Sequence, residues 1–155
     1  MVRTLYTVGY EGLKIDEFLT LVLDSPIDLI VDTRWTPLSR KPGFSKSGLR
    51  QRLTDQRKEY VHIPQLGSPK VLRQELADSQ DWSAFARQYL AWLNDQEEAL
   101  ASLRALAAGM VVGLLCFEAN PHRCHRSLVA TTVLGQLEGY AWSDLSRYGE
   151  RMLRS

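Results

Sequence analysis

Runs of β-branched and aromatic residues alternate along this chain with segments whose apolar residues repeat at helical spacing. The alternation predicts parallel strands joined by helices, because a parallel pair needs a long crossover that is usually helical. We therefore predict a single-domain three-layer α/β sandwich over residues 1–155, with a mostly parallel, Rossmann-like sheet. Strands are predicted at 3–8, 27–32, 59–64, 110–117 and 141–145, and helices at 13–25, 47–56, 82–94, 96–108 and 127–140.

The bulk composition narrows the possible partners and the compartment. The net charge is +1, so there is no overall attraction to nucleic acids or anionic membranes. No apolar run approaches the length of a membrane span, and the N-terminal segment MVRTLYTVGY has no signal-peptide pattern. We expect a cytoplasmic protein that does not contact membranes. In that compartment the two cysteines are expected to be free thiols or metal ligands rather than a structural disulfide.

Unusual residues follow four of the predicted strands. The carboxyl ends of parallel strands lie at one edge of a sheet, and open α/β sheets bind their ligands there. We therefore expect these residues to converge in one site. They are Gly9, Tyr10 and Glu11 after the first strand, Asp32 and Arg34 after the second, Leu66 and Gly67 after the third, and Cys116 and Glu118 after the fourth.

The segment 116–127 reads CFEANPHRCHRS and carries the densest chemistry in the chain. Asn120 and Pro121 predict a helix start, because Asn caps helices and Pro suits their first position. The cations that follow would meet the positive end of the helix dipole, which favours a bound anion there. That anion could be Glu118, Asp32 or a phosphate-like ligand. The alternative is that these side chains extend into water.

Cys124 is the candidate nucleophile of this segment. Neighbouring histidines and arginines and a helix N-terminus lower the pKa of a thiol and make it reactive. His125 would act as its base or orient it, and Glu118 would complete the catalytic group. An inert Cys124 and a metal-binding Cys124 remain alternatives. Cys116, at the end of an apolar strand, is expected to be buried.

The anion itself is assigned to a separate group of residues. Arginines would hold a phosphate-like group, and Asp32 or Glu118 would position them. The partner would be a phosphate-containing small molecule or a nucleic acid, and no cofactor is expected. The predicted binding residues are Arg34, Arg40, Arg126, Asp32, Gly9, Tyr10 and Cys116.

Two other interpretations use overlapping residues. The loop 33–46 interleaves Arg34, Arg40, Lys41 and Lys46 with Trp35 and Phe44, a pattern that suits phosphate contacts and base stacking in a nucleic-acid-binding module without catalysis. Alternatively, Cys116, His122, Cys124 and His125 are of the residue types that bind zinc in a structural site, although their spacing matches no standard zinc finger.

The motifs TVGYEG, VDTRWTPLSRKPGFSKSGLRQRL, YVHIPQLGS and LLCFEANPHRCHRS together resemble the bacterial and archaeal family known as domain of unknown function 488. The resemblance runs from about Thr7 to about Leu134. It implies no established activity, but it supports the same site residues. These are Gly9, Asp32, Arg34, Pro37, Ser39, Arg40, Gly43, Phe44, Ser45, Lys46, Cys116, Glu118, Cys124, His125 and Arg126. Ser68 stands where the family pattern leads us to expect a second glycine.

A fainter similarity is to rhodanese-like domains. The segment VDTR resembles their strand end, and Arg126, Ser127, Ala130 and Leu134 resemble the helix after their catalytic loop. Nine residues separate Cys116 from Arg126 and only one separates Cys124 from it. An anion-cradling loop of the rhodanese kind therefore cannot form unchanged, and this likeness is an analogy only.

Overall fold

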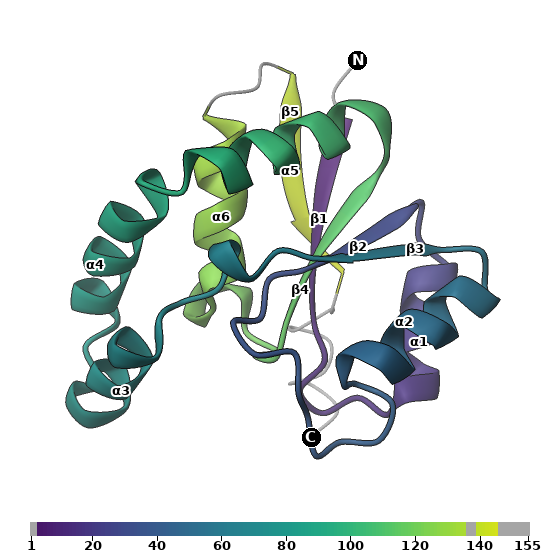
Figure 1. The fold of residues 1–155 in the computed structure, drawn as a ribbon, viewed down its shortest axis with the longest axis horizontal. Coiled ribbons are helices and arrows are strands. Elements are labelled where there is room, and N and C mark those ends of the chain that lie inside the picture. Colours follow the sequence, from purple (N-terminus) through teal and green to yellow (C-terminus); the bar gives the residue numbers. More distant parts are fainter. Residues whose placement is uncertain (1–2, 136–138, 146–155) are drawn as a thin grey trace.

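The computed structural model describes residues 3–135 and 139–145. One sheet with strand order β3-β2-β4-β1-β5 runs through this part of the chain, and every pairing in it is parallel. The predicted α/β class is therefore confirmed (Figure 1). The strands are β1 (Arg3–Gly9), β2 (Leu29–Asp32), β3 (Glu59–His62), β4 (Val112–Cys116) and β5 (Tyr140–Asp144), and the helices are α1 (Ile15–Leu23), α2 (Lys46–Asp55), α3 (Lys70–Ser79), α4 (Trp82–Asn94), α5 (Glu97–Gly109) and α6 (His125–Leu134).

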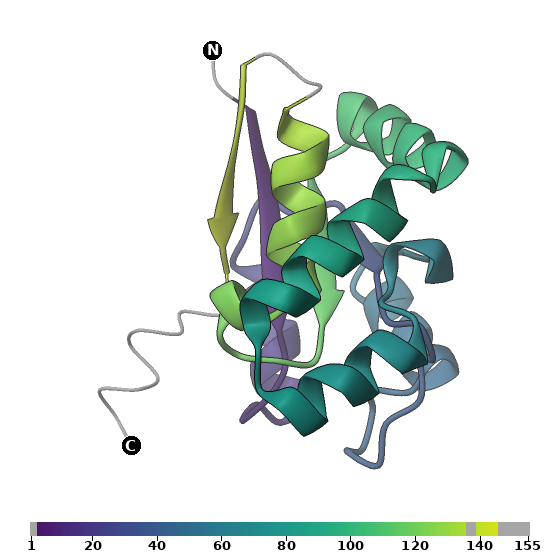
Figure 2. The same cartoon turned by 90° about the vertical axis from the view of Figure 1, so that its left-hand side faces the viewer.

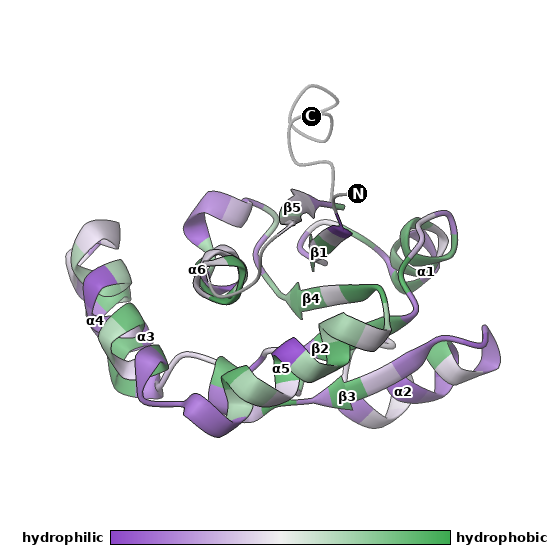
Figure 3. Ribbon diagram, turned by 90° about the horizontal axis from the view of Figure 1, so that it is seen from above, coloured by the Kyte–Doolittle hydropathy of each residue, from purple (hydrophilic) through white to green (hydrophobic). Residues whose placement is uncertain are grey.

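Helices cover both faces of the sheet, as Figure 3 shows from above. Successive strand residues point to opposite faces, so neighbouring residues of β2 enter different cores. Ile30 packs with α1 and α2, whereas Leu29 and Val31 pack with α4, α5 and α6. Two apolar cores on the two faces of one sheet give the predicted three layers. None of the helices in the described ranges is both long and apolar enough to cross a bilayer.

Several element boundaries differ from the prediction. The sequence analysis missed α3, which is polar overall and contains no fully buried residue, although Leu72 and Leu76 pack against the core from one side of it. Helix α2 begins at Lys46 with Ser45 as its N-cap, not at the predicted Ser47. Helix α6 begins at His125 and ends at Leu134, so it starts before the predicted 127–140 range. Residues 136–138 of that predicted helix lie outside the described part of the chain.

Strand β4 lies between β1 and β2, and this position in the sheet determines where the site forms. The connections that leave β1 and β2 lead to α1 and α2 on one face, whereas the connection that leaves β4 leads to α6 on the other. Connections that diverge to opposite faces leave a crevice at the carboxyl ends of the strands between them. Cys116, the last residue of β4, lies at that crevice. Figure 2 shows β5 as the outer strand beside β1.

Close packing across this crevice requires a glycine at the end of β1. A Cβ on Gly9 would overlap the carbonyl of Glu118 and lie 2.9 Å from Nη1 of Arg126. The backbone after β1 is also bonded to the backbone after β4, because the amide of Glu11 donates to the carbonyl of Phe117 at 2.7 Å. Gly9 thus holds the segment after β4 against β1.

We predict that Gly9→Ala lowers the free energy of unfolding by about 1–3 kcal/mol, because the new methyl group overlaps backbone that cannot yield. Urea denaturation measures this change. The matched control is Gly109→Ala at the end of α5, where no atom lies within 4 Å of the new Cβ. Its stability should stay equal or rise by up to about 1 kcal/mol. Equal stabilities for the two variants would contradict the packing role of Gly9.

Candidate functional site at the carboxyl edge of the sheet

A pocket of about 380 Å³ opens at the carboxyl ends of β1, β2 and β4. This is the edge at which the sequence predicts the site. Of the predicted catalytic residues, Cys124, His125 and Glu118 all line it, together with Cys116, Arg34 and Tyr10 from the predicted binding group. The remaining lining residues are Trp35, Thr36, Leu38, Ser39, Ser68, Arg73, Leu76, Trp82, Phe85, Phe117 and Arg123.

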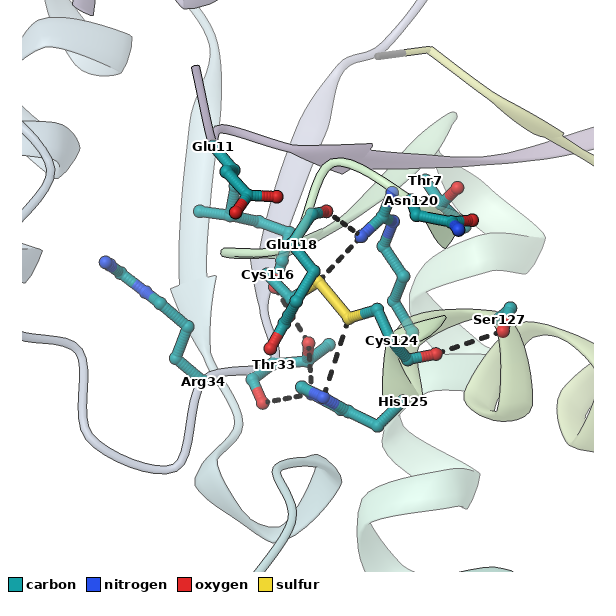
Figure 4. The surroundings of a disulfide bond; sticks show 12 residues. Thr7, Glu11, Thr33, Arg34, Cys116, Glu118, Asn120, Cys124, His125 and Ser127 are labelled. Atoms are coloured by element: carbon teal, nitrogen blue, oxygen red, sulfur yellow. Dashed lines mark hydrogen bonds between the residues drawn. A yellow bond between two sulfur atoms is a disulfide. The ribbon is translucent and has the colours of Figure 1, made fainter. Parts of the chain in front are cut away.

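The two cysteines are joined to each other. Cys116 at the end of β4 and Cys124 before α6 form a disulfide, as Figure 4 shows. The expectation that both are free thiols or metal ligands is therefore wrong for this structure. No sequence pattern indicates the pairing, because a separation of eight residues does not determine how a strand end and a helix start meet. Each sulfur nevertheless belongs to the pocket wall.

The hydrogen bonds of Thr33 determine which nitrogen of His125 carries the proton. The hydroxyl of Thr33 donates to the carbonyl of Leu115 at 2.7 Å, so its oxygen can only accept from the imidazole. Nε2 of His125 lies 3.0 Å from both that hydroxyl and the carbonyl of Thr33, and it must donate to them. Nδ1 is then the unprotonated nitrogen, and it lies 3.7 Å from Sγ of Cys124. The predicted Cys124–His125 pair is thus in contact.

His125 is a neutral imidazole at pH 7. Its pKa is lowered to about 4, mainly by burial and also by the charges of Arg126 and Arg73, against the raising effects of its bond to Thr33 and the charge of Asp32. The ring also packs edge-on against Tyr89, with 5.7 Å between centroids. A neutral ring with a fixed tautomer presents one lone pair to the cysteine.

The start of α6 differs from the prediction in its capping residue. Asn120 accepts from the amide of His122 and caps a short 3₁₀ turn, Pro121–Arg123, rather than the α-helix. Cys124 itself is the N-cap of α6. Its sulfur therefore lies at the positive end of a helix dipole, a position that lowers the pKa of a reduced thiol.

Arg126 points into the protein and does not line the pocket. Its guanidinium is fully buried and donates to Sγ of Cys116 at 2.8 Å and to the carbonyls of Glu118 and Ala119. It also pairs with Asp144 of β5 at 3.1 Å. The predicted contact between Arg126 and a ligand anion is therefore replaced by contacts that hold the segment 116–119. Its N–H···S bond is of the kind that stabilises a thiolate.

Arg34 and Asp32 form a buried ion pair. Nε and Nη2 of Arg34 each donate to a different carboxylate oxygen of Asp32, at 2.8 and 2.7 Å. Nη1 donates to the carbonyl of Phe44 at 2.6 Å and to the hydroxyl of Tyr10 at 3.3 Å. Figure 4 shows the Arg34 side chain directed away from the disulfide. Asp32 thus orients Arg34, as the sequence analysis predicts. Most of the N–H donors of Arg34 are engaged in bonds within the protein.

Glu118 and Arg40 take contrasting places. The carboxyl group of Glu118 is partly exposed, lines the pocket and has a pKa raised mainly by burial, against the lowering effect of Arg126. One of its oxygens and the sulfurs of Cys116 and Cys124 all lie within 4.8 Å of one another. Arg40 is exposed on the loop after β2 and is not among the residues of the pocket.

The observed geometry alters the zinc interpretation and weakens the nucleic-acid interpretation of the sequence. The possible ligand group in the described ranges is Cys116, Glu118 and Cys124. It contains Glu118 and lacks both predicted histidines, His125 and His122, and the exposed ring of His122 packs near Trp142. In the loop 33–46, Phe44 is fully buried and cannot stack on a base. The amine of Lys41 donates to the carbonyls of Tyr10 and Leu13, and that cation is therefore committed internally.

Several residues of the site were missed by the sequence analysis. Arg73 and Leu76 come from α3, which was not predicted, and Trp82 and Phe85 come from the predicted helix 82–94 but were not singled out as site residues. Thr33 adjoins the recognised Asp32 but has an ordinary side chain for a strand end. Asp144 gave no signal at all. Ser68, the departure from the family pattern, is buried and lines the pocket.

The family model described as "Domain of unknown function DUF488" matches residues 14–133. The chain belongs to the DUF488 family. No curated protein and no solved structure matches it. The DUF488 match covers the loops after β2, β3 and β4, and thus most of the pocket wall, while the end of β1 lies outside the matched range.

We predict that His125 makes stability depend on pH. The unfolded histidine binds a proton near pH 6.5, whereas the folded one does so only near pH 4. The unfolded state therefore binds more protons between these values, and the free energy of unfolding should fall as the pH falls through this window, by at most about 1.4 kcal/mol per pH unit. Urea denaturation from pH 4 to 7.5 measures the slope.

The His125→Gln variant should lose this contribution to the slope, because glutamine does not titrate. His122→Gln is the matched control, since His122 is exposed, and it should retain the slope of the unmodified protein. If His125→Gln keeps the full slope, the burial of a neutral His125 is refuted.

Proposed function

We propose that this DUF488 protein is a cysteine-dependent enzyme that acts on an anionic small molecule in the pocket. The observation that carries the proposal is the unprotonated Nδ1 of His125 facing Sγ of Cys124 at 3.7 Å, at a helix N-terminus and in a pocket wall. A thiol and an oriented base in contact are the elements of nucleophilic catalysis. This proposal keeps the roles predicted for Cys124 and His125.

In the reduced enzyme Nδ1 of His125 takes the proton of the Cys124 thiol as the sulfur attacks an electrophilic centre of the substrate. A bond from sulfur to that centre forms as the bond to the leaving group breaks. Glu118, whose pKa is raised, supplies a proton to the leaving group. Water then displaces the sulfur, with His125 and Glu118 returning to their starting protonation states.

The disulfide is the resting oxidised form in this proposal. A reducing thiol attacks one sulfur, and a second equivalent releases the mixed disulfide, so two external thiols are oxidised to one disulfide while Cys116 and Cys124 become thiols. Only then is Cys124 available to a substrate. The proposal therefore requires reducing conditions for activity, which agrees with the expected cytoplasmic location.

We predict that Cys124 of the reduced Cys116→Ser variant is alkylated well below pH 8, because the helix N-terminus favours its thiolate and Nδ1 of His125 can accept the thiol proton during the attack. Iodoacetate, an anion, should react faster than neutral iodoacetamide, and inorganic phosphate should slow both. Peptide mass spectrometry measures the rates. The Cys116→Ser variant is used so that no disulfide can form.

The control for that experiment is His125→Gln in the same background. Loss of the imidazole removes the base that accepts the thiol proton and should slow alkylation at pH 6 by at least about tenfold. His122→Gln should react at the unaltered rate. A Cys124 that stays unreactive up to pH 8, or that reacts equally with the His125→Gln substitution, would refute nucleophilic catalysis.

A metal site is the second candidate, because donor atoms of Cys116, Glu118 and Cys124 lie within 4.8 Å of one another. Nδ1 of His125 could add a fourth ligand, and its Nε2–H already donates to the carbonyl of Thr33, as in many metal-binding histidines. Two thiolates, an imidazole and a carboxylate suit zinc. Zinc binding would require the disulfide to be reduced first.

The metal hypothesis predicts that zinc raises the Tm of the reduced protein and that a chelator reverses the rise. Substitution Cys116→Ser should abolish the rise because it removes a ligand, whereas His122→Gln should leave it intact. Differential scanning fluorimetry measures the shift. An unchanged Tm with excess zinc would refute the metal site and leave the nucleophile hypothesis as the remaining candidate.

A further inference from the structure

Exposed apolar side chains gather at the mouth of the pocket. The large apolar residues that are exposed in the described ranges are Leu23, Trp35, Leu38, Val71 and Phe117. Trp35, Leu38 and Phe117, with exposed fractions of 41%, 71% and 44%, all line the pocket. Apolar side chains that stay in water around a concave site indicate that a ligand covers them.

Most of these apolar groups are aromatic rings held in place by other rings. Trp35 packs against Trp92 with 5.9 Å between centroids, and Phe117 meets Tyr10 edge-on at 5.3 Å. Trp82, which also lines the pocket, packs against Phe85 at 5.0 Å. Rings that are already immobilised can stack on a flat ligand with little further loss of conformational entropy.

Two exposed arginines supply the positive charge of the pocket. Arg34 is paired with Asp32 and Arg126 with Asp144. Among the described residues, the cations left at the pocket surface are Arg73 from α3 and Arg123 from the turn before α6. Arg73 lines the same pocket as Cys124, His125 and Glu118, and its charge lowers the pKa of the last two. An anion held by Arg73 and Arg123 would therefore lie beside Cys124.

We propose that the pocket binds a nucleoside monophosphate, with its base stacked on Trp35 and its phosphate held by Arg73 and Arg123. This inference rests on the proposed function for the reaction, and it names the substrate class. A pocket of about 380 Å³ falls within the range of small-molecule sites. A longer nucleic acid is disfavoured, because Phe44 is buried and Lys41 is bonded internally, so the loop 33–46 offers no continuous track of rings and cations.

The test is isothermal titration calorimetry on the Cys116→Ser, Cys124→Ser double variant, which can bind but cannot react. The probes are adenosine and uridine 5′-monophosphates, adenosine, inorganic phosphate and a single-stranded oligothymidine. We expect each monophosphate to bind at least about tenfold more tightly than adenosine or phosphate, since it uses both the rings and the arginines. Its affinity should also exceed that of the oligonucleotide per site.

Variants of the same double mutant separate the two contacts. Trp35→Ala should weaken the monophosphates roughly tenfold and leave phosphate unchanged, whereas Arg73→Ala should weaken both. Arg87→Ala is the control, because Arg87 is exposed on α4 and does not line the pocket. Phosphate binding as tight as that of the monophosphates, tighter oligonucleotide binding, or an unchanged affinity in Trp35→Ala would overturn the inference.

The outcome is separable from that of the proposed function. Tight monophosphate binding together with an unreactive Cys124 would support the proposed ligand class and refute the proposed enzymatic function. If Cys124 reacts preferentially with iodoacetate but the pocket binds monophosphates no more tightly than phosphate, the proposed enzymatic function is supported and this substrate class is refuted.

Discussion

The buried guanidinium of Arg126 holds the carboxyl edge of the sheet together. It reaches Cys116 at the end of β4, the carbonyls of Glu118 and Ala119, and Asp144 of β5. A buried charge is tolerated only when it is paired and hydrogen-bonded. Loss of any of these partners would leave the buried guanidinium partly unpaired, and this energetic cost keeps the partners in place. The segment after β4 must then pass close over β1, which is why Gly9 has no room for a side chain.

This arrangement separates structural charge from ligand-binding charge. The Asp32–Arg34 pair fastens the loop after β2 in the same way that Arg126 fastens the loop after β4. The arginines of both pairs lie in segments that, in sequence, resemble an anion site. The positive charge left for a ligand lies on Arg73 and Arg123, which are exposed at the pocket. The pocket thus combines a rigid, internally neutralised floor with a cationic and aromatic rim.

Features of the fold and the site that depend on local sequence patterns could be predicted, whereas features that depend on contacts between distant segments could not. The parallel sheet and the convergence of strand ends followed from hydrophobic period and chain order, which sequence displays directly. Helix α3 was missed because it is polar overall and only Leu72 and Leu76 pack against the core, and its Arg73 was missed with it. The inward direction of Arg126 depends on Asp144 of β5, and the disulfide depends on how a turn folds back. Neither contact leaves a pattern in adjacent residues.

The two sulfurs lie in different surroundings, and this asymmetry determines how the proposed chemistry would run. Cys116 accepts a hydrogen bond from the Arg126 guanidinium, whereas Cys124 lies at the N-terminus of α6 beside Nδ1 of His125. In thiol–disulfide exchange the sulfur that is better stabilised as a thiolate leaves faster. A reducing thiol would therefore attack Cys124 and release Cys116, whose negative charge Arg126 holds. Cys116 then stays fixed at the strand end, and Cys124, once freed, is the sulfur that has both a base and the pocket beside it.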